Sequence, residues 1–491
     1  VIMPMARYCV ALALALACAC VTDAAVVGAR PAHVRAIAML RGGDRAGVSA
    51  RKPSLRGRAQ LSAVAGSQNT EQPGSGGGTM SVSASSVALM KNIVGGGLLA
   101  LPAGMAAAQG TGFVPAIGVC TVSAILSGYT YWTIGEAVQA TGATDFKSLW
   151  DKTLGKKSSW VINSTIICLA FSAVVMYGCF LGDLISALVP SLTRTSALVG
   201  VTAAVLLPLC LQRDLSALSF TSYTGIGAVA FTAFVIVKRW LDGTYGAAGN
   251  FLLAGLPYAP ALGQLSAMRL SAGTFVLFNM LSTAYMAHTN AVRFYTELKD
   301  RSPRKFATVC AVGFGSAAVA HALVMVAGYA TFGGASQGLI LNNLHLSADK
   351  LASAARVATG ISIMGSHPLL FTSLRDSVLS SLSGTKIGDA VNESPAAWTA
   401  LSVGMLVLAT LTAIVATDVG FVASVSGASL GAILIFVVPG LMQLSTIQMA
   451  GGGAAKGGKA TIAKGLVAFG GVMAVLGTTV TCLETFTDVF R

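Results

Sequence analysis

The chain has 491 residues, of which 54% are apolar and only 10% are charged. Soluble domains carry about 25% charged residues, so this composition excludes an ordinary soluble globular protein and predicts helices that are solvated by a lipid bilayer. The net charge of +14 does not indicate a nucleic-acid partner, because nine of the 32 basic residues precede residue 84 and no basic patch with interleaved aromatic residues occurs.

The N-terminal part of the chain differs in composition from the rest. Arg7 precedes an apolar run over residues 10–21 that ends in small residues, which is typical of a secretory signal and too short for a membrane-spanning helix. Residues 30–58 carry eight basic residues against the single acid Asp44, without apolar periodicity. Residues 74–78 form a glycine-rich linker.

These features predict three regions. We expect a signal-peptide-like leader over residues 1–24, a basic transit-like segment with a flexible linker over 25–80, and a membrane domain over 81–491. A signal followed by a transit-like stretch resembles the bipartite leader that directs proteins to a plastid with extra bounding membranes in some algae. The alternative is a basic tail on a protein of an endomembrane or vacuolar membrane.

Apolar runs in the remaining sequence predict eleven membrane helices, most of which reach the roughly 20 residues needed to cross about 30 Å of hydrocarbon. They lie near residues 84–109, 112–137, 159–189, 195–212, 217–240, 270–294, 306–332, 353–374, 396–416, 418–443 and 462–486. The connections on the N-terminal side hold fifteen Lys and Arg residues and those on the opposite side hold seven, which places the N-terminus on the cytosol-equivalent side. Lys238 and Arg239, at the end of the fifth helix, fall on the wrong side.

The first predicted helix contains three consecutive glycines, Gly95, Gly96 and Gly97, followed by Pro102. Each glycine weakens a helix by about 1 kcal/mol relative to alanine, so local unwinding here costs little. Unwound backbone in a membrane needs polar partners, and a bound zwitterion with a coupling cation can provide them. The alternative is close packing of neighbouring helices against small residues.

The sixth predicted helix has a polar cluster over residues 279–290. If helices one to five and six to ten form two inverted halves, helix six is the counterpart of helix one, and paired interruptions of this kind indicate a central site. We therefore predict a substrate site formed by the helix-one glycines and by Ser282, Thr283, Ala284 and Tyr285. Side-chain selection would come from residues whose alternative role is apolar core packing: Phe278, Tyr285, Phe171 and Met176.

Several sequence blocks resemble the amino acid/auxin permease family, which includes sodium-coupled neutral, proton-coupled and vacuolar amino acid transporters. Residues 91–102 are similar to the family's Gly-x-Gly-x-Leu-x-Leu-Pro helix, and residues 288–298 to its His…Ile-Tyr-x-Glu-Leu segment. Further matching blocks lie at residues 328–342, 367–376 and 425–440.

The resemblance implies an all-α polytopic membrane protein with about eleven helices, a five-plus-five inverted repeat and broken helices one and six. It implies secondary active transport of amino acids by alternating access, coupled to H⁺ or Na⁺ and using no other cofactor. Lipid and an amino acid are then the expected partners, and a monomer is the expected state. Lys91 stands where the sodium-coupled branch has an asparagine, with Asn92 beside it, and this leaves the coupling ion open.

Five residues are candidates for ion coupling: Lys91, Asn92, Ser362, Ser366 and His288. Lys91 in a membrane helix faces a cavity or a partner, or it extends to the interface. The serines supply oxygens on helix eight, where the superfamily places a cation, or they bond to their own helix. His288 relays protons or holds helix six through a hydrogen bond across the bundle.

Glu297 and Arg375, at predicted cytosolic helix ends, are candidates for an inner gate, with ordinary interfacial charges as the alternative. The sequence has no Gly-x-Ser-x-Gly elbow, P-loop, zinc motif or paired cysteines, so we expect neither an enzyme nor a metal site. An amino-acid-sensing transceptor with little flux is the alternative function.

Overall fold

The computed structural model describes residues 78–212, 219–246, 249–253, 258–416, 418–450 and 457–487. The predicted leader and nearly all of the transit-like segment lie outside these residues. Within the described ranges the chain is helical, and its β-structure consists of isolated bridges such as that between Met80 and Leu298. The all-α prediction is therefore confirmed.

The first half of the membrane domain begins with a helix in two parts. Its elements are α3 (Val82–Ile93), η2 (Gly96–Ala100), α4 (Leu101–Ala106), α5 (Phe113–Thr141), α6 (Phe146–Thr153), η3 (Lys156–Ser158), α7 (Ser159–Leu188), α8 (Arg194–Val201), η4 (Thr202–Leu206), α9 (Leu207–Cys210), α10 (Ser219–Leu241), α11 (Asn250–Leu253) and η6 (Leu262–Gln264).

The second half also begins with a divided helix. It contains α12 (Gly273–Ala284), η7 (His288–Asn290), α13 (Ala291–Thr296), α14 (Pro303–Phe332), η8 (Ile340–Asn343), α15 (Lys350–Leu382), α16 (Lys386–Glu393), α17 (Pro395–Val415), α18 (Val419–Ser426), η9 (Gly427–Gly431), η10 (Ile433–Val437), α19 (Val438–Met449) and α20 (Gly458–Phe486).

All eleven predicted segments coincide with helical stretches. Among the described residues, seven helices are long and apolar enough to cross a membrane, and the bent pair at the start of the domain makes eight. The predicted fourth, fifth and sixth segments are helical in the expected places, as α8–α9, α10 and α12–α13, but they are not among those spans. The polytopic architecture is confirmed, and the count of eleven spans stays a prediction.

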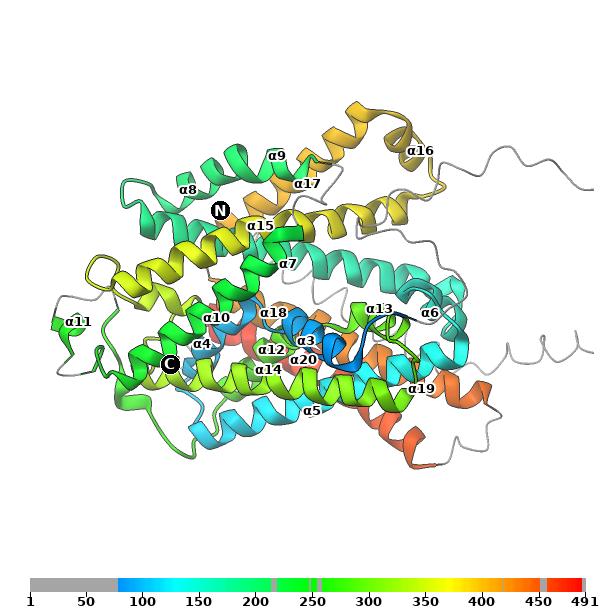
Figure 1. Cartoon of the computed structure of the whole chain (residues 1–491), viewed down its shortest axis with the longest axis horizontal. Helices are drawn as coiled ribbons and strands as arrows, with labels where there is room; N and C mark the ends of the chain where they lie inside the picture. The colour runs from blue at the N-terminus through cyan, green and yellow to red at the C-terminus, as the bar shows by residue number, and fades with distance from the viewer. Residues whose placement is uncertain are drawn as a thin grey trace, which may run out of the picture.

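The two-part helices lie inside the bundle. In Figure 1, α3, α12 and α18 occupy the middle of the view, with α5 and α14 along one side and α8, α9 and α17 along the other. Glycines allow close contacts between these helices. A Cβ placed on Gly313 of α14 would lie 2.8 Å from Leu89 of α3, and one on Gly470 of α20 would lie 2.8 Å from Phe436.

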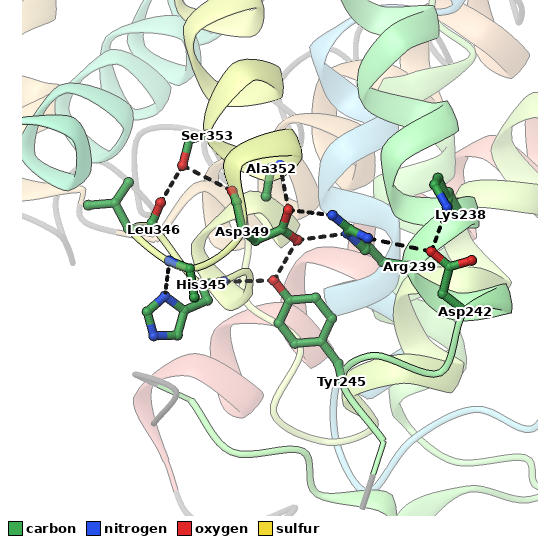
Figure 2. Close-up of polar contacts among 10 residues, drawn as sticks. Lys238, Arg239, Asp242, Tyr245, His345, Leu346, Asp349, Ala352 and Ser353 are labelled. Atoms are coloured by element: carbon green, nitrogen blue, oxygen red, sulfur yellow. Dashed lines mark hydrogen bonds and ion pairs between the residues drawn. The ribbon is translucent and has the colours of Figure 1, made fainter. Parts of the chain in front are cut away.

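A buried ion pair joins the end of α10 to the start of α15 (Figure 2), and we call it the α10–α15 clamp. The Asp349 side chain is fully buried, and its two oxygens accept hydrogen bonds from Nε and Nη2 of Arg239 at 2.8 and 2.7 Å. The Tyr245 hydroxyl donates to the same carboxylate at 2.9 Å and the Ala352 N–H at 3.0 Å. Burial raises the pKa of Asp349, but these hydrogen bonds outweigh it and hold the pKa below its ordinary value of 3.8.

The clamp explains why Lys238 and Arg239 lie on the side of the membrane where the charge count predicts few basic residues. Arg239 is paired with Asp349, and Lys238 lies 2.7 Å from the Asp242 carboxylate. Both positive charges are thus balanced locally by acids, which the count of Lys and Arg alone ignores. Their position at the end of the fifth helix is compatible with the orientation that the other connections indicate.

We predict that Asp349→Ala destabilises the fold by about 3 kcal/mol at neutral pH, because it leaves the Arg239 guanidinium with no bidentate partner. The lowered pKa means that this contribution is present above the ordinary carboxyl range and is lost as the pH falls through the Asp349 pKa. Thermal unfolding of the purified chain in detergent measures both effects. Glu136→Ala, at a partly exposed pair with Lys459 outside the clamp, is the control and should cost less than about 1 kcal/mol. Equal losses in the two variants would contradict a special role for the clamp.

Candidate binding site at two broken helices

The first helix is interrupted where the sequence places its three glycines. The α3 helix ends at Ile93, Val94 (φ −80°, ψ 92°) and Gly95 (φ −131°, ψ −155°) are extended, and η2 begins at Gly96. The two parts are inclined by 45°. The predicted unwinding is therefore confirmed, and Pro102 lies in the first turn of α4, which restarts the helix.

The sixth helix is interrupted as well. The α12 helix ends at Ala284, where the Tyr285 N–H donates to the Leu281 carbonyl at 2.8 Å, and helical structure resumes at His288. A Cβ on Gly97 would lie 3.5 Å from Cα of Ala284. The two breaks therefore adjoin, although nearly 190 residues separate them in the sequence.

Helix ends of opposite polarity meet at these breaks. The start of η2, at Gly96, presents backbone N–H groups and a partial positive charge, whereas the end of α12, at Ala284, presents carbonyl groups and a partial negative charge. A zwitterion has a carboxylate for the first end and an ammonium for the second.

The α7 helix covers the first break with two aromatic residues. The Tyr177 hydroxyl is hydrogen-bonded to the backbone of Gly96. A Cβ on Gly96 would lie 3.1 Å from the Phe180 ring, so only glycine fits there without displacing it. Sequence reasoning chose Phe171 and Met176 on this helix and missed Tyr177, although a phenolic hydroxyl in an otherwise apolar stretch was an available signal.

The polar side chains of the second break point into helix packing. Ser282 donates to the Phe278 carbonyl of its own helix at 3.0 Å, and Thr283 donates to the Ala423 carbonyl of α18. Tyr285 is fully buried, with its hydroxyl 3.2 Å from Sγ of Cys120 on α5. At these positions the backbone, and not the side chain, remains the candidate for ligand contact.

Phe278 packs in the apolar core, which was the alternative to a role in substrate selection. Its ring centroid lies 6.1 Å from that of Phe436 and 5.7 Å from that of Phe469, in an apolar cluster with η10 and α20. Met176 is also buried. Core packing accounts for both side chains.

Among the ion-coupling candidates, Asn92 is joined to the other broken helix. Its Oδ1 accepts a hydrogen bond from Nδ2 of Asn290 at 3.2 Å, which connects the last turn of α3 to η7. Lys91 precedes it on the same turn and is half-buried. Ser362 and Ser366 lie one turn apart on α15, and Ser362 faces α10, where its Oγ is 3.1 Å from a Cβ placed on Gly225.

His288 is held firmly against α5. It is fully buried, its Nε2 lies 3.0 Å from Oγ1 of Thr130, and its ring is edge-on to Tyr131 at 5.6 Å. This contact between helix six and α5 is the one expected if His288 holds helix six across the bundle.

In this conformation each residue of the predicted inner gate has another partner, and the gate stays a prediction. Glu297 is 2.7 Å from Nε of Arg293, one turn earlier in the chain. Arg375 is buried on α15, where it donates to the Cys210 carbonyl at 2.8 Å and lies 4.3 Å from the Trp398 ring centroid. Arg375 faces α9 and α17 because its guanidinium gains a carbonyl and an aromatic surface there.

Comparison with known proteins finds a matching family and several relatives. The sequence profile of a family described as transmembrane amino acid transporter protein matches residues 78–483. A putative sodium-coupled neutral amino acid transporter 11 of Danio rerio is 25% identical over 60% of this chain and 64% of its own length. Vacuolar amino acid transporter 2 of Saccharomyces cerevisiae is 23% identical over 48% of this chain and 49% of its own. The chain thus spans just under two thirds of the first relative and about half of the second.

A solved structure has the same fold. The crystal structure of MhsT in complex with L-phenylalanine superposes with a TM-score of 0.51 at 12% identity, covering 83% of this chain and 100% of that chain. At this level of identity the likeness concerns the fold alone.

We predict that Gly96→Val weakens binding of a zwitterionic ligand at least about tenfold. The new side chain displaces Phe180 and the Tyr177 hydroxyl from the break, and a hydrogen bond to a charged group is worth about 1.5–3 kcal/mol. Binding of labelled neutral amino acids to the purified chain is the measurement. Gly118→Val is the matched control, since a Cβ at Gly118 meets nothing within 4 Å; the same loss in both variants would argue against a site at the break.

Proposed function

The chain belongs to the family of transmembrane amino acid transporter proteins, and we propose that it moves amino acids across its membrane by secondary active transport with the paired helix breaks as its binding site. It is an integral membrane transporter and not an enzyme. The family profile, the relatives and the transporter fold support amino acid transport. The observation that carries the proposed site is the contact between Gly97 and Ala284, which brings a helix N-terminus and a helix C-terminus to one point.

In the proposed mechanism, the carboxylate of the substrate accepts hydrogen bonds from the backbone at Gly95, Gly96 and Gly97 and from the Tyr177 hydroxyl. The ammonium group donates to carbonyl oxygens at the end of α12, between Ser282 and Ala284. Both interactions use partial charges that the helix ends already provide. Alternating access then follows from movement of the broken helices relative to α7.

We propose that H⁺ or Na⁺ drives this transport. Carbonyl groups at the end of α3 and the Asn92 side chain are oxygen ligands of the kind that Na⁺ binds, and the sodium-coupled relative favours that ion. Lys91, beside them, favours H⁺, because a lysine ammonium in an apolar setting readily exchanges its proton. The gradient experiment below distinguishes the two ions.

For the membrane in which the chain works, the bipartite leader favours a plastid, whereas the yeast vacuolar relative favours an endomembrane. We propose the plastid membrane, with the chain acting as a monomer. A fluorescent fusion of residues 1–80 that reaches a vacuole or the plasma membrane would overturn the plastid assignment.

The test of transport is flux of labelled amino acids into proteoliposomes that hold the full chain, under imposed Na⁺ or H⁺ gradients. We expect saturable uptake of at least one amino acid that follows one gradient and disappears in Gly96→Val. Binding without flux would favour a transceptor. Neither binding nor flux across the twenty common amino acids would overturn the substrate class.

We also predict that Tyr177→Phe raises KM for the transported amino acid about tenfold and changes kcat little, because it removes one hydrogen bond to the bound carboxylate. Initial rates in the same proteoliposomes provide both constants. Tyr258→Phe, at an exposed tyrosine, is the matched control. An unchanged KM in Tyr177→Phe would remove this hydroxyl from the site.

A further inference from the structure

His321 is a buried histidine in the middle of α14. It was not among the candidates selected from the sequence, and the proposed mechanism does not use it. Its side chain is fully buried, and among the described residues neither ring nitrogen has a hydrogen-bond partner. His288, in contrast, has its Nε2 bonded to Thr130. A buried polar group without a partner is rare in folded proteins and indicates a role, such as a site for water or a proton.

The position of His321 along α14 coincides with the first helix break. Earlier in α14, Gly313 contacts Leu89 of α3, and later in α14, Gly328 contacts Pro102 of α4. His321 lies about halfway between these glycines, so it is level with the interruption at residues 95–97 that lies halfway between Leu89 and Pro102.

His321 also contacts the second break. Its ring is edge-on to Tyr285, the first residue after α12, with the ring centroids 4.8 Å apart. The Tyr285 hydroxyl lies 3.2 Å from Sγ of Cys120 on α5, and that sulfur is 3.8 Å from the Ala318 carbonyl, one turn before His321. These three side chains form a small polar cluster between α5, α12 and α14, which we call the His321 cluster.

The described side chains on the helices that pack on α14 include no carboxylate near His321 that could balance a positive charge. The helices packed around α14 carry these described titratable or charged groups: Cys120, Tyr129, Tyr131 and Glu136 on α5, Lys91 on α3, and Lys238 and Arg239 on α10. The α14 helix itself carries Arg304, Lys305, Cys310 and Tyr329. The described residues of η2, α4 and η6 include no such group. Glu136 lies near the inner end of α5, where Lys459 is 3.0 Å from it. The imidazole is therefore neutral in this packing, because an unpaired charge in an apolar interior is costly.

We propose that His321 binds the coupling proton of the transport cycle, with Tyr285 as the residue that opens and closes access to it. When the helix-six break moves, the Tyr285 ring leaves the imidazole, water enters the His321 cluster, and a free ring nitrogen takes a proton from water on one side of the membrane. The proton is released to water on the other side when the neutral packing seen here returns. Imidazole suits this exchange because it titrates near neutral pH once it is hydrated. This inference rests on the proposed transport function and selects H⁺ as the coupling ion.

The test compares two assays on full-length chain in proteoliposomes: uptake driven by a proton gradient, and exchange of labelled for unlabelled amino acid at equal pH, which needs no net proton movement. In His321→Gln we expect exchange within about twofold of the parent chain, but gradient-driven accumulation at least about tenfold lower. Internal pH, followed with an entrapped indicator dye, should no longer change when amino acid is added outside. His367→Gln, at an equally buried histidine on α15, is the matched control and should keep both activities.

The outcomes separate this inference from the transport assignment. Absence of both binding and flux in the parent chain would overturn the proposed transport function itself. Flux in the parent chain that follows Na⁺ alone, or proton-driven accumulation that survives in His321→Gln, overturns the role of His321. If His321→Gln does not fold, His321→Asn places an amide near the Nδ1 position and is judged by the same two assays. Proton uptake that persists in a folded His321→Asn chain overturns the inference as well.

Discussion

The contact between Gly97 and Ala284 is the one on which the rest of the arrangement depends. Interrupted helices are tolerated in a bilayer only where protein or a cavity surrounds the exposed backbone groups. Here each break has its own cover: Tyr177 and Phe180 of α7 lie over the first, and α18 accepts a hydrogen bond from Thr283 at the second. The helices around the site are thus placed by the need to enclose two irregular segments, and in the proposed function a ligand with two charges would complete the enclosure.

The two parts of helix six share α5 as a neighbour but differ in their other contacts. On one side of the break, α12 packs on α18 and η9, where a Cβ on Gly427 would lie 1.7 Å from the Asn279 carbonyl oxygen, so no larger residue fits. On the other side, η7 and α13 are held to α5, through Thr130 at His288 and through Gln139, which accepts a 2.6 Å hydrogen bond from Tyr295. A movement of α18 relative to α5 would therefore act on the backbone at Tyr285, between the two parts.

The sequence was informative where local chemistry decides the structure. Consecutive glycines followed by Pro102 weaken a helix regardless of its neighbours, so both the interruption and its place were predictable. The partners of individual side chains were not predictable, because they depend on which helices pack together. Tyr177 finds Gly96 from a distant helix, Arg375 faces Trp398 instead of Glu297, and Arg239 pairs with Asp349 across 110 positions of sequence. The polar cluster at helix six was recognised, but its hydroxyls serve helix packing, since a membrane helix must first satisfy its own polar groups.

Two groups of helices meet at the proposed site, and α10 contacts both of them because it packs on α15 and on α14. The α14 helix packs along α3 and α5, and α5 holds the second broken helix, which joins predicted helices one, two, six and seven. The α15 helix packs along α7 and α10, and the α10–α15 clamp together with a 2.8 Å hydrogen bond between Thr232 and Thr359 fixes α10 to it at two levels. The glycine break belongs to the first group and Tyr177 to the second. A ligand bound between them touches both groups at once, so its binding energy can act directly on the equilibrium between their arrangements, which is the thermodynamic requirement for coupling a substrate to a conformational change.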